Sequence, residues 1–286
     1  MTYILGESIR FCVRLMPSFA GAAILPDLKK SLVFKNRDLQ TSSNSDELFY
    51  DVDCFGVRGV DNVTGAIGGL SIGVNRHGLI IANTHVRNTK DPSYHTLTEQ
   101  LLIFAKDAED GLSMTMDQLQ RDRHYQWGNL ILADNDSMLV IELAGNDHSI
   151  EWSERRVLRT SHHIMLETEQ TLREEGVKYD SSVKRVERGY DLIRQARSVD
   201  DIFALLRDHG RSPGQESLCR HATGDVGLST TMSYVVEVDH NTDSGKPKIV
   251  FHVAKGNPCQ SEYTAIPIVF PADEEIMTRA LQLYPK

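Results

Sequence analysis

Apolar runs separated by short polar turns recur along the chain in a way that is typical of β-hairpins. Between residues 18 and 39, the apolar segments SFAGAAIL and SLVFKNRDL are separated by PDLKK, in which Pro26-Asp27 marks the reversal. Two more pairs follow the same pattern, GAIGGLSIGV with GLIIANTHV and GNLILAD with SMLVIEL. Because their strands are nearly all apolar, we expect sheets covered on both faces, and IEWSE and RRVLRTS are expected to extend the last of them.

Segments with apolar residues at helical spacing lie between these predicted strands. A capping box of Thr96 with Glu99 opens LTEQLLIFAKDA, in which apolar residues recur at helical spacing, and Ser198 with Asp201 caps a shorter helix, DIFALLRDH. Further helices are predicted for SVKRVERGYDLIRQA and DEEIMTRALQLY, further strands for TTMSYVVEVD and PKIVFHVAKG, and a loop for residues 40–53. The pattern predicts an α+β protein with mainly antiparallel sheets and outer helices, in one domain over residues 1–286.

Composition and charge narrow the class of protein. The 286 residues are 40% hydrophobic and 25% charged, which excludes a disordered chain. Lysine and arginine number 31 against 40 acidic residues, so the net charge of 31 − 40 = −9 opposes nucleic-acid binding. No apolar run approaches the roughly 20 residues that cross a bilayer, so we expect neither a membrane anchor nor a signal peptide. A homo-oligomer is compatible with this composition.

Four cysteines, at positions 12, 54, 219 and 259, show no C-x-x-C spacing. Free thiols in a reducing cytoplasm fit this pattern better than a disulfide framework. We interpret Gly256-Asn257-Pro258-Cys259 as a turn with a buried thiol. Eleven histidines are present without an H-E-x-x-H motif or a clustered His/Asp/Glu spacing, and Walker and G-x-G-x-x-G loops are absent, so the sequence predicts neither a metal nor a cofactor.

Two short motifs are candidates for chemistry. Gly69-Leu70-Ser71-Ile72-Gly73 matches G-x-S-x-G, but a turn and another strand follow it where a nucleophile elbow requires a helix, so Ser71 is predicted to be a strand residue. Asn36-Arg37-Asp38 ends an apolar strand, where the carboxylate either is solvated at a sheet edge or orients a cationic amine. Arg37 is expected to face away from Asp38, as a solvated or helix-facing charge.

Six segments together resemble the acyl-coenzyme A:6-aminopenicillanic acid acyltransferase family, within the N-terminal nucleophile hydrolase superfamily. They are SLVFKNRDL (31–39), GVNRHGLIIANTHV (73–86), WGNLILADNDSMLVIEL (127–143), RTSHH (159–163), SLCRHA (217–222) and KGNPCQSEY (255–263). Their order and approximate spacing also agree with that family. The resemblance implies a four-layer αββα sandwich of two antiparallel sheets between helices, which is compatible with the predicted hairpins.

Enzymes of this family use the first residue of the mature chain as nucleophile and its α-amine as general base, and the resemblance gives Asp38 the role of holding that amine. If the hairpin reverses near Asp27-Leu28, antiparallel partners sum to about 55 to 57, which places Asp38 opposite residues 17 to 19. Ser18 therefore becomes the candidate nucleophile, exposed by cleavage after Pro17, with residues 1–17 as a short leader. Cys12 lies roughly 20 Å farther back at about 3.3 Å per residue.

The resemblance also implies oxyanion donors on two later strands. Asn83 is the candidate amide, and Ser161 stands where the family pattern leads us to expect an asparagine. His162 and Arg220 are candidate supporting residues. The alternatives are a hydrogen-bonded core histidine for His162 and, for Arg220, an ion pair with a carboxylate at a sheet edge.

We therefore expect an amide hydrolase or N-acyltransferase that acts on a small-molecule or peptide-like amide, or on an acyl donor, through an acyl-enzyme intermediate. Two other hypotheses remain open at this point. One is a non-catalytic relative of the same fold that acts as a binding or interaction protein. The other is a thiol enzyme that uses Cys12 or Cys54 without processing and needs a histidine within hydrogen-bond reach.

Overall fold

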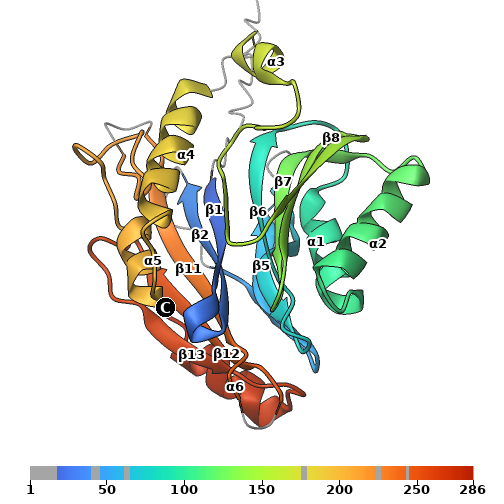
Figure 1. Ribbon diagram of the computed structural model, residues 1–286, viewed down its shortest axis with the longest axis vertical. Coiled ribbons are helices and arrows are strands. Elements are labelled where there is room, and N and C mark those ends of the chain that lie inside the picture. Colours follow the sequence, from blue (N-terminus) through green and yellow to red (C-terminus); the bar gives the residue numbers. More distant parts are fainter. Residues whose placement is uncertain are drawn as a thin grey trace, which may run out of the picture.

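The computed structural model describes residues 18–39, 46–60, 65–174, 179–222, 227–242 and 245–285 (Figure 1). Cys12 and the predicted leader lie outside these residues. Two β-sheets pack face to face, and every strand pair in them is antiparallel. Among the described residues, no helix combines the length and the apolar character needed to span a membrane.

The first sheet has six strands and carries the N-terminal hairpin in its middle. Its order is β10 (Arg156–Arg159), β1 (Ser18–Leu25), β2 (Lys30–Leu39), β11 (Ser229–Asp239), β12 (Lys248–Lys255) and β13 (Thr264–Ile268). A 3-10 turn, Pro26–Leu28, joins β1 to β2, and Lys29 after it adopts a left-handed conformation. Ser18 pairs with Arg37, so partners in this hairpin sum to 55, which confirms the predicted register.

The second sheet has seven strands in chain order. They are β3 (Leu48–Tyr50), β4 (Cys54–Val60), β5 (Ile67–Asn75), β6 (Ile80–Arg87), β7 (Tyr125–Ala133), β8 (Met138–Gly145) and β9 (Asp147–Ser153). The hairpins predicted around residues 75–78 and 135–136 are therefore confirmed. The prediction of a loop over residues 40–53 is wrong at its end, where β3 adds to the edge formed by β4, whose Cys54 is buried in a strand.

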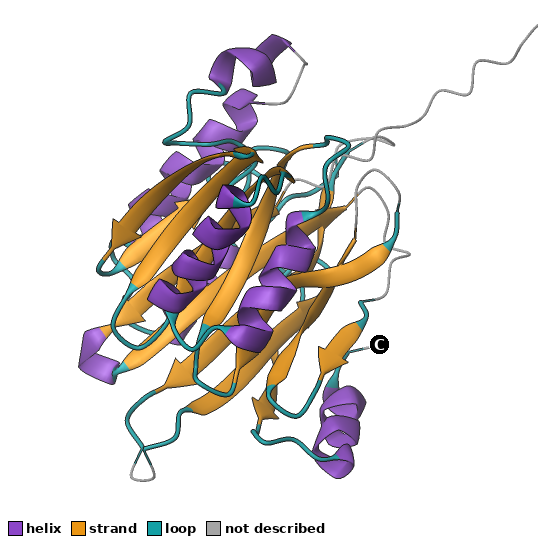
Figure 2. Cartoon of the chain, turned by 90° about the vertical axis from the view of Figure 1, so that its right-hand side faces the viewer, coloured by secondary structure: helices purple, strands orange, loops and turns teal. Residues whose placement is uncertain are grey.

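Helices complete the outer layers. α1 (Tyr94–Phe104) and α2 (Ala108–Gln120) cover the seven-stranded sheet, and Figure 2 shows them in front of its strands. α4 (Tyr179–Ile193) and α5 (Val199–Leu206) cover the six-stranded sheet, while α3 (Glu169–Glu174) and α6 (Glu274–Leu283) lie outside these layers. Separate apolar cores fill the space between the sheets and beneath each pair of covering helices. The fold is thus the four-layer αββα sandwich that the resemblance implied.

Two details of the sequence-based assignment are wrong. RRVLRTS does not extend the sheet of β9, because β10 pairs with β1 in the other sheet, where Val157 and Leu158 are buried on both faces. Thr96 does not cap α1. Ser93 is the N-cap and accepts a hydrogen bond from the His95 N–H, while the Thr96 hydroxyl donates to the Ser93 carbonyl. The capping box predicted for α5 from Ser198 and Asp201 is confirmed.

Candidate active site

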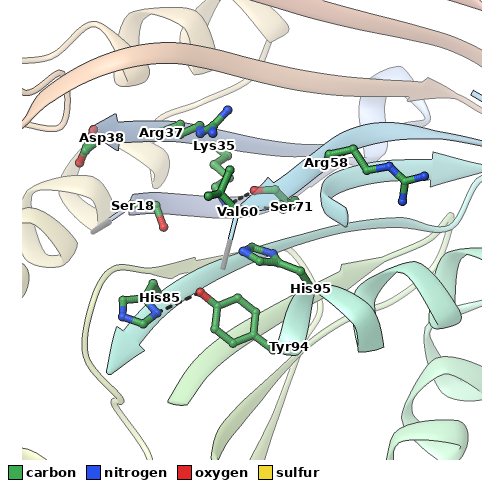
Figure 3. Close-up of a pocket in the computed structure, with 11 residues that line it drawn as sticks. Ser18, Lys35, Arg37, Asp38, Arg58, Val60, Ser71, His85, Tyr94 and His95 are labelled. Carbon is green, nitrogen blue, oxygen red and sulfur yellow. Dashed lines mark hydrogen bonds between the residues drawn. The ribbon is translucent and has the colours of Figure 1, made fainter. Parts of the chain in front are cut away.

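The start of β1 and the end of β2 meet at a small pocket between the two sheets (Figure 3). Ser18 pairs with Arg37, so Asp38 stands one position beyond the partner of Ser18. The hairpin supplies Ser18, Lys35, Arg37 and Asp38, and the facing sheet with α1 supplies Arg58, Gly59, Val60, Ser71, His85, Tyr94 and His95. The structure therefore brings together the predicted nucleophile and the acid predicted to hold its amine.

Asp38 is fully buried and is surrounded by donors. The Thr230 hydroxyl donates to its Oδ1 at 2.8 Å, and Arg220 Nε and Arg185 Nη1 lie 3.6 and 3.9 Å from its Oδ2. Oδ2 nevertheless has no hydrogen-bond partner among the described residues. Burial raises the pKa of the Asp38 carboxyl, and the two guanidinium groups and Thr230 oppose that rise.

The Asp38 carboxylate and the Ser18 hydroxyl project to opposite faces of the hairpin. Directly paired residues project to the same face of a sheet, so Ser18 shares its face with Arg37 while Asp38 projects toward the helical layer. Arg185 of α4, which lies near Asp38 Oδ2, also donates from Nη1 to the Ser18 carbonyl at 3.4 Å. Arg185 therefore connects Asp38 with the backbone at the start of β1.

Lys35 is a buried cation on the same face of the hairpin as Ser18. It is only 4% exposed, and its Nζ donates to the Ser71 hydroxyl at 2.6 Å and to the Asn83 carbonyl and Oδ1 at 2.7 and 3.2 Å. Burial, with help from the Arg37 charge, lowers the pKa of Lys35 to about 7. The pocket thus holds an amine that changes protonation near neutral pH.

Arg37 faces the interior between the sheets. It forms a buried ion pair with Asp46, whose carboxylate also accepts hydrogen bonds from Tyr234, at 2.6 Å, and Tyr284. The expectation of a solvated or helix-facing Arg37 is therefore wrong, because the alternation that turns Asp38 toward the helices turns Arg37 into the core. This cluster fixes the wall of the pocket beside Ser18.

Asn83 and Ser71 are near neighbours of Lys35 but differ in what they can donate. Both N–H groups of the Asn83 amide are in use, donated to the Leu70 carbonyl and the Thr98 hydroxyl at 2.9 Å each. The amide therefore has no N–H left for an oxyanion in this arrangement. Ser71 lies within β5, followed by a turn and β6, which confirms its prediction as a strand residue.

Ser161 and His162 follow β10 at the edge of the six-stranded sheet. The Ser161 hydroxyl is buried and has no hydrogen-bond partner within the part of the chain that the structure describes. His162 Nδ1 lies 2.8 Å from the Ser182 hydroxyl and 3.0 Å from that of Thr160. Burial, together with the nearby Arg185 charge, lowers the pKa of His162 to about 4, so its ring is neutral near pH 7, as expected of a hydrogen-bonded core histidine.

Arg220 was expected either to support the candidate site or to form an ion pair with a carboxylate, and the structure shows its contacts. It donates from Nε to the Gln215 carbonyl at 2.9 Å and from Nη2 to the Ser181 hydroxyl at 3.1 Å, and the carboxylate nearest to it is that of Asp38. Its backbone N–H donates to Thr230 Oγ1, which in turn donates to Asp38. Arg220 therefore forms an ion pair with a carboxylate at the end of an inner strand and not at a sheet edge.

Comparison with known protein families identifies the family of this chain. Residues 27–231 match the acyl-coenzyme A:6-aminopenicillanic acid acyl-transferase family. The chain belongs to this family. Its members are amidases and acyltransferases of the N-terminal nucleophile hydrolase superfamily. None of the curated protein sequences gives a significant match.

Two solved structures of other proteins have the same fold as this chain. A mutant of the conjugated bile acid hydrolase from Clostridium perfringens superposes with a TM-score of 0.53 at 10% identity, covering 88% of this chain and 92% of that one. Penicillin V acylase from Agrobacterium tumefaciens gives a TM-score of 0.50 at 11% identity, covering 87% and 86%. The N-terminal nucleophile hydrolase fold is therefore established for this chain.

Sequence reasoning missed several polar residues around the candidate site, among them Lys35 in the pocket and Arg185 beside Asp38. Lys35 had a usable signal, since it is a lysine at an inward position of the apolar run SLVFK. Arg185 had none, because its helix shows several basic residues and only packing against β1 and β2 distinguishes the buried one.

Proposed function

We propose that the chain is an amide hydrolase or N-acyltransferase for small-molecule or peptide-like amides, with Ser18 as its nucleophile after cleavage behind Pro17. The observation that carries this proposal is the buried Oδ2 of Asp38, which lacks a hydrogen-bond partner among the described residues and lies at the register position next to residue 18. A carboxylate oxygen in that place is suited to accept a hydrogen bond from the α-amine of a new N-terminus.

The local charges favour the form of the amine that catalysis needs. An α-amine has a reference pKa of about 7.7 to 8.0, close to working pH. Two guanidinium groups, of Arg185 and Arg220, surround the single carboxylate of Asp38, so the cluster is positive overall and favours the neutral amine. The neutral amine can accept a proton without help from a histidine.

In the proposed reaction the α-amine takes the proton of the Ser18 hydroxyl while the Ser18 oxygen attacks the carbonyl carbon of the substrate amide. The tetrahedral intermediate collapses as the C–N bond breaks, and the α-ammonium returns its proton to the leaving amine. Water or a second amine then attacks the acyl ester and regenerates Ser18. The unpartnered Ser161 hydroxyl is our candidate oxyanion donor, in place of Asn83 with its fully used amide.

One contact favours Ser71 as an alternative nucleophile for the same reaction. The Ser71 hydroxyl lies 2.6 Å from Lys35 Nζ, and the pKa of Lys35 is lowered to about 7. A neutral Lys35 would take the proton of Ser71 directly, as in serine–lysine enzymes, and this route needs no cleavage of the chain.

Paired substitutions distinguish the two nucleophiles. The probes are penicillin V and a conjugated bile acid, chosen from the activities of the structural relatives, with a serine-reactive fluorophosphonate as a label that needs no known substrate. We expect Ser18→Ala to lower turnover by at least about a thousandfold and to abolish labelling, as loss of a nucleophile does. Ser71→Ala should stay within about tenfold, with unchanged circular dichroism for both variants.

The opposite pattern, with labelling lost only in Ser71→Ala, would transfer the role to Ser71 and Lys35. An uncut wild-type chain that neither turns over the probes nor accepts the label would contradict both routes and favour the non-catalytic binding protein.

A further inference from the structure

Four potential metal ligands converge at the end of the six-stranded sheet, outside the pocket that holds Ser18. His209, Cys219 and His221 come from the connection between α5 and β11, and Cys259 comes from the connection between β12 and β13. One ligand atom from each residue lies within 4.8 Å of all the others. Cys219 is buried and the other three are half-buried, so an ion could enter from solvent.

The separations between these atoms approach those of a tetrahedral zinc site. The two sulfurs are 3.5 Å apart, His221 Nε2 lies 3.7 and 3.3 Å from the sulfurs of Cys219 and Cys259, and the Nε2 atoms of His209 and His221 are 3.0 Å apart. Bonds of about 2.3 Å to sulfur and about 2.05 Å to nitrogen give ligand separations of about 3.8, 3.6 and 3.3 Å in a regular tetrahedron. Each of these four separations is within about 0.4 Å of its counterpart, and the ligand atoms of His209 and of each cysteine lie within 4.8 Å of one another.

We propose that His209, Cys219, His221 and Cys259 bind one structural Zn²⁺ ion. Two thiolates and two imidazoles in tetrahedral positions are the ligand set that zinc prefers, and four protein ligands leave no coordination position for a substrate. A disulfide between Cys219 and Cys259 is the competing chemistry. It would require the sulfurs to approach to about 2.05 Å and would leave the two facing histidines without a role.

Surrounding hydrogen bonds hold the cysteine ligands in place. The Asn257 amide lies 3.6 Å from the Cys219 sulfur and donates to the Arg220 carbonyl at 2.6 Å, while the Cys219 N–H donates to the Asp208 carbonyl at 3.0 Å. A turn from Asn257 to Gln260, closed by the Gln260 N–H, presents Cys259. Partners of this kind orient ligands in metal sites.

The ion would act on the candidate active site through Arg220. Cys219 and His221 flank Arg220, whose guanidinium approaches Asp38 and whose backbone N–H donates to Thr230. Binding both neighbours to Cys259 would fix the segment that carries this guanidinium. The metal proposal itself rests on the ligand geometry and holds whichever serine is the nucleophile.

Metal analysis of the purified full chain tests the proposal. When the protein is expressed with added zinc, we expect inductively coupled plasma mass spectrometry to find about one zinc ion per chain. Exchange for Co²⁺ should give the visible bands of tetrahedral cobalt and a thiolate-to-cobalt charge-transfer band. Changing a residue around a metal ligand weakens binding about 10- to 100-fold, so loss of a ligand in Cys259→Ser or His209→Ala should weaken Zn²⁺ binding at least about 100-fold.

Cys54→Ala is the matched control, because Cys54 is a free cysteine in the other sheet and should leave the stoichiometry unchanged. The cobalt spectrum of the wild-type chain tests the site even if a ligand variant fails to fold. The proposal would be overturned if the wild-type protein contains no zinc or if its cobalt spectrum lacks thiolate bands. It would also be overturned if metal-free protein contains a Cys219–Cys259 disulfide and does not bind added Zn²⁺.

Discussion

Burial pushes Lys35 and Asp38 toward their neutral forms, although they carry opposite charges and project from opposite faces of β2. The pKa of Lys35 is lowered to about 7, and that of Asp38 is raised against the pull of two arginines. The Lys35 ammonium donates to hydroxyl and amide oxygens, whereas the Asp38 carboxylate lies beside guanidinium groups. At the residue scale, this strand therefore supplies two groups whose charge is sensitive to their surroundings.

Lys35 should make the stability of the protein depend on pH. The unfolded chain, with a pKa near 10.5, binds more protons than the folded chain between pH 7 and 10.5. The free energy of unfolding should therefore rise with pH in that interval, by up to about 1.4 kcal/mol per unit from this group. The penalty is absent above about pH 10.5 and complete below about pH 7.

Urea denaturation of the wild type and Lys35→Met at pH 6, 7, 8 and 9 measures this contribution. The difference between the two proteins should grow in favour of the wild type from pH 7 to pH 9, since a methionine side chain does not titrate. A difference that stays constant over this range would show that Lys35 keeps its proton throughout and is unsuited to act as a base.

At the scale of elements, the start of α1 shows that a local capping motif does not always mark the first residue of a helix. The sequence TLTE, from Thr96 to Glu99, has the form of a capping box, yet the helix begins earlier, because Ser93 caps it and Thr96 lies inside its first turn. Ser93→Ala should lower the free energy of unfolding by about 1 kcal/mol, as loss of an N-cap does, and Thr96→Ala by less than that. Thermal or urea denaturation of the two variants provides the measurement. A larger loss in Thr96→Ala would place the N-cap at Thr96.

The hairpins were predictable because each depends on local alternation and turn chemistry. Pro26-Asp27 fixed the reversal closely enough to place Ser18 opposite Arg37. The sheet to which β10 belongs was not predictable, since its choice of β1 over β9 depends on a pairing across more than a hundred residues. α2 was missed because its polar sequence, AEDGLSMTMDQLQ, contains a glycine and buries few large apolar residues, so it has no clear apolar stripe.

At the scale of the whole molecule, buried polar clusters connect elements that are distant in sequence. Glu142 of β8 accepts from Arg159 of β10 at 2.9 Å and from the backbone N–H groups of Ile164, Met165 and Leu166, and so links the two sheets. The candidate site shares this property. Ser18 and Asp38 could be paired from one hairpin, whereas the approach of Arg185 and Arg220 and the convergence of the proposed zinc ligands depend on tertiary packing.

The central claim is that residue 18 becomes the N-terminus of the working enzyme, and the intact mass of the purified protein tests it most directly. We expect a mass that lacks residues 1–17, and an Edman sequence that starts Ser-Phe-Ala, whereas Ser18→Ala should remain uncut. A wild-type chain that retains residues 1–17 while turning over amides would contradict the claim. Loss of residues 1–11 alone would contradict it as well, and would move the nucleophile to Cys12.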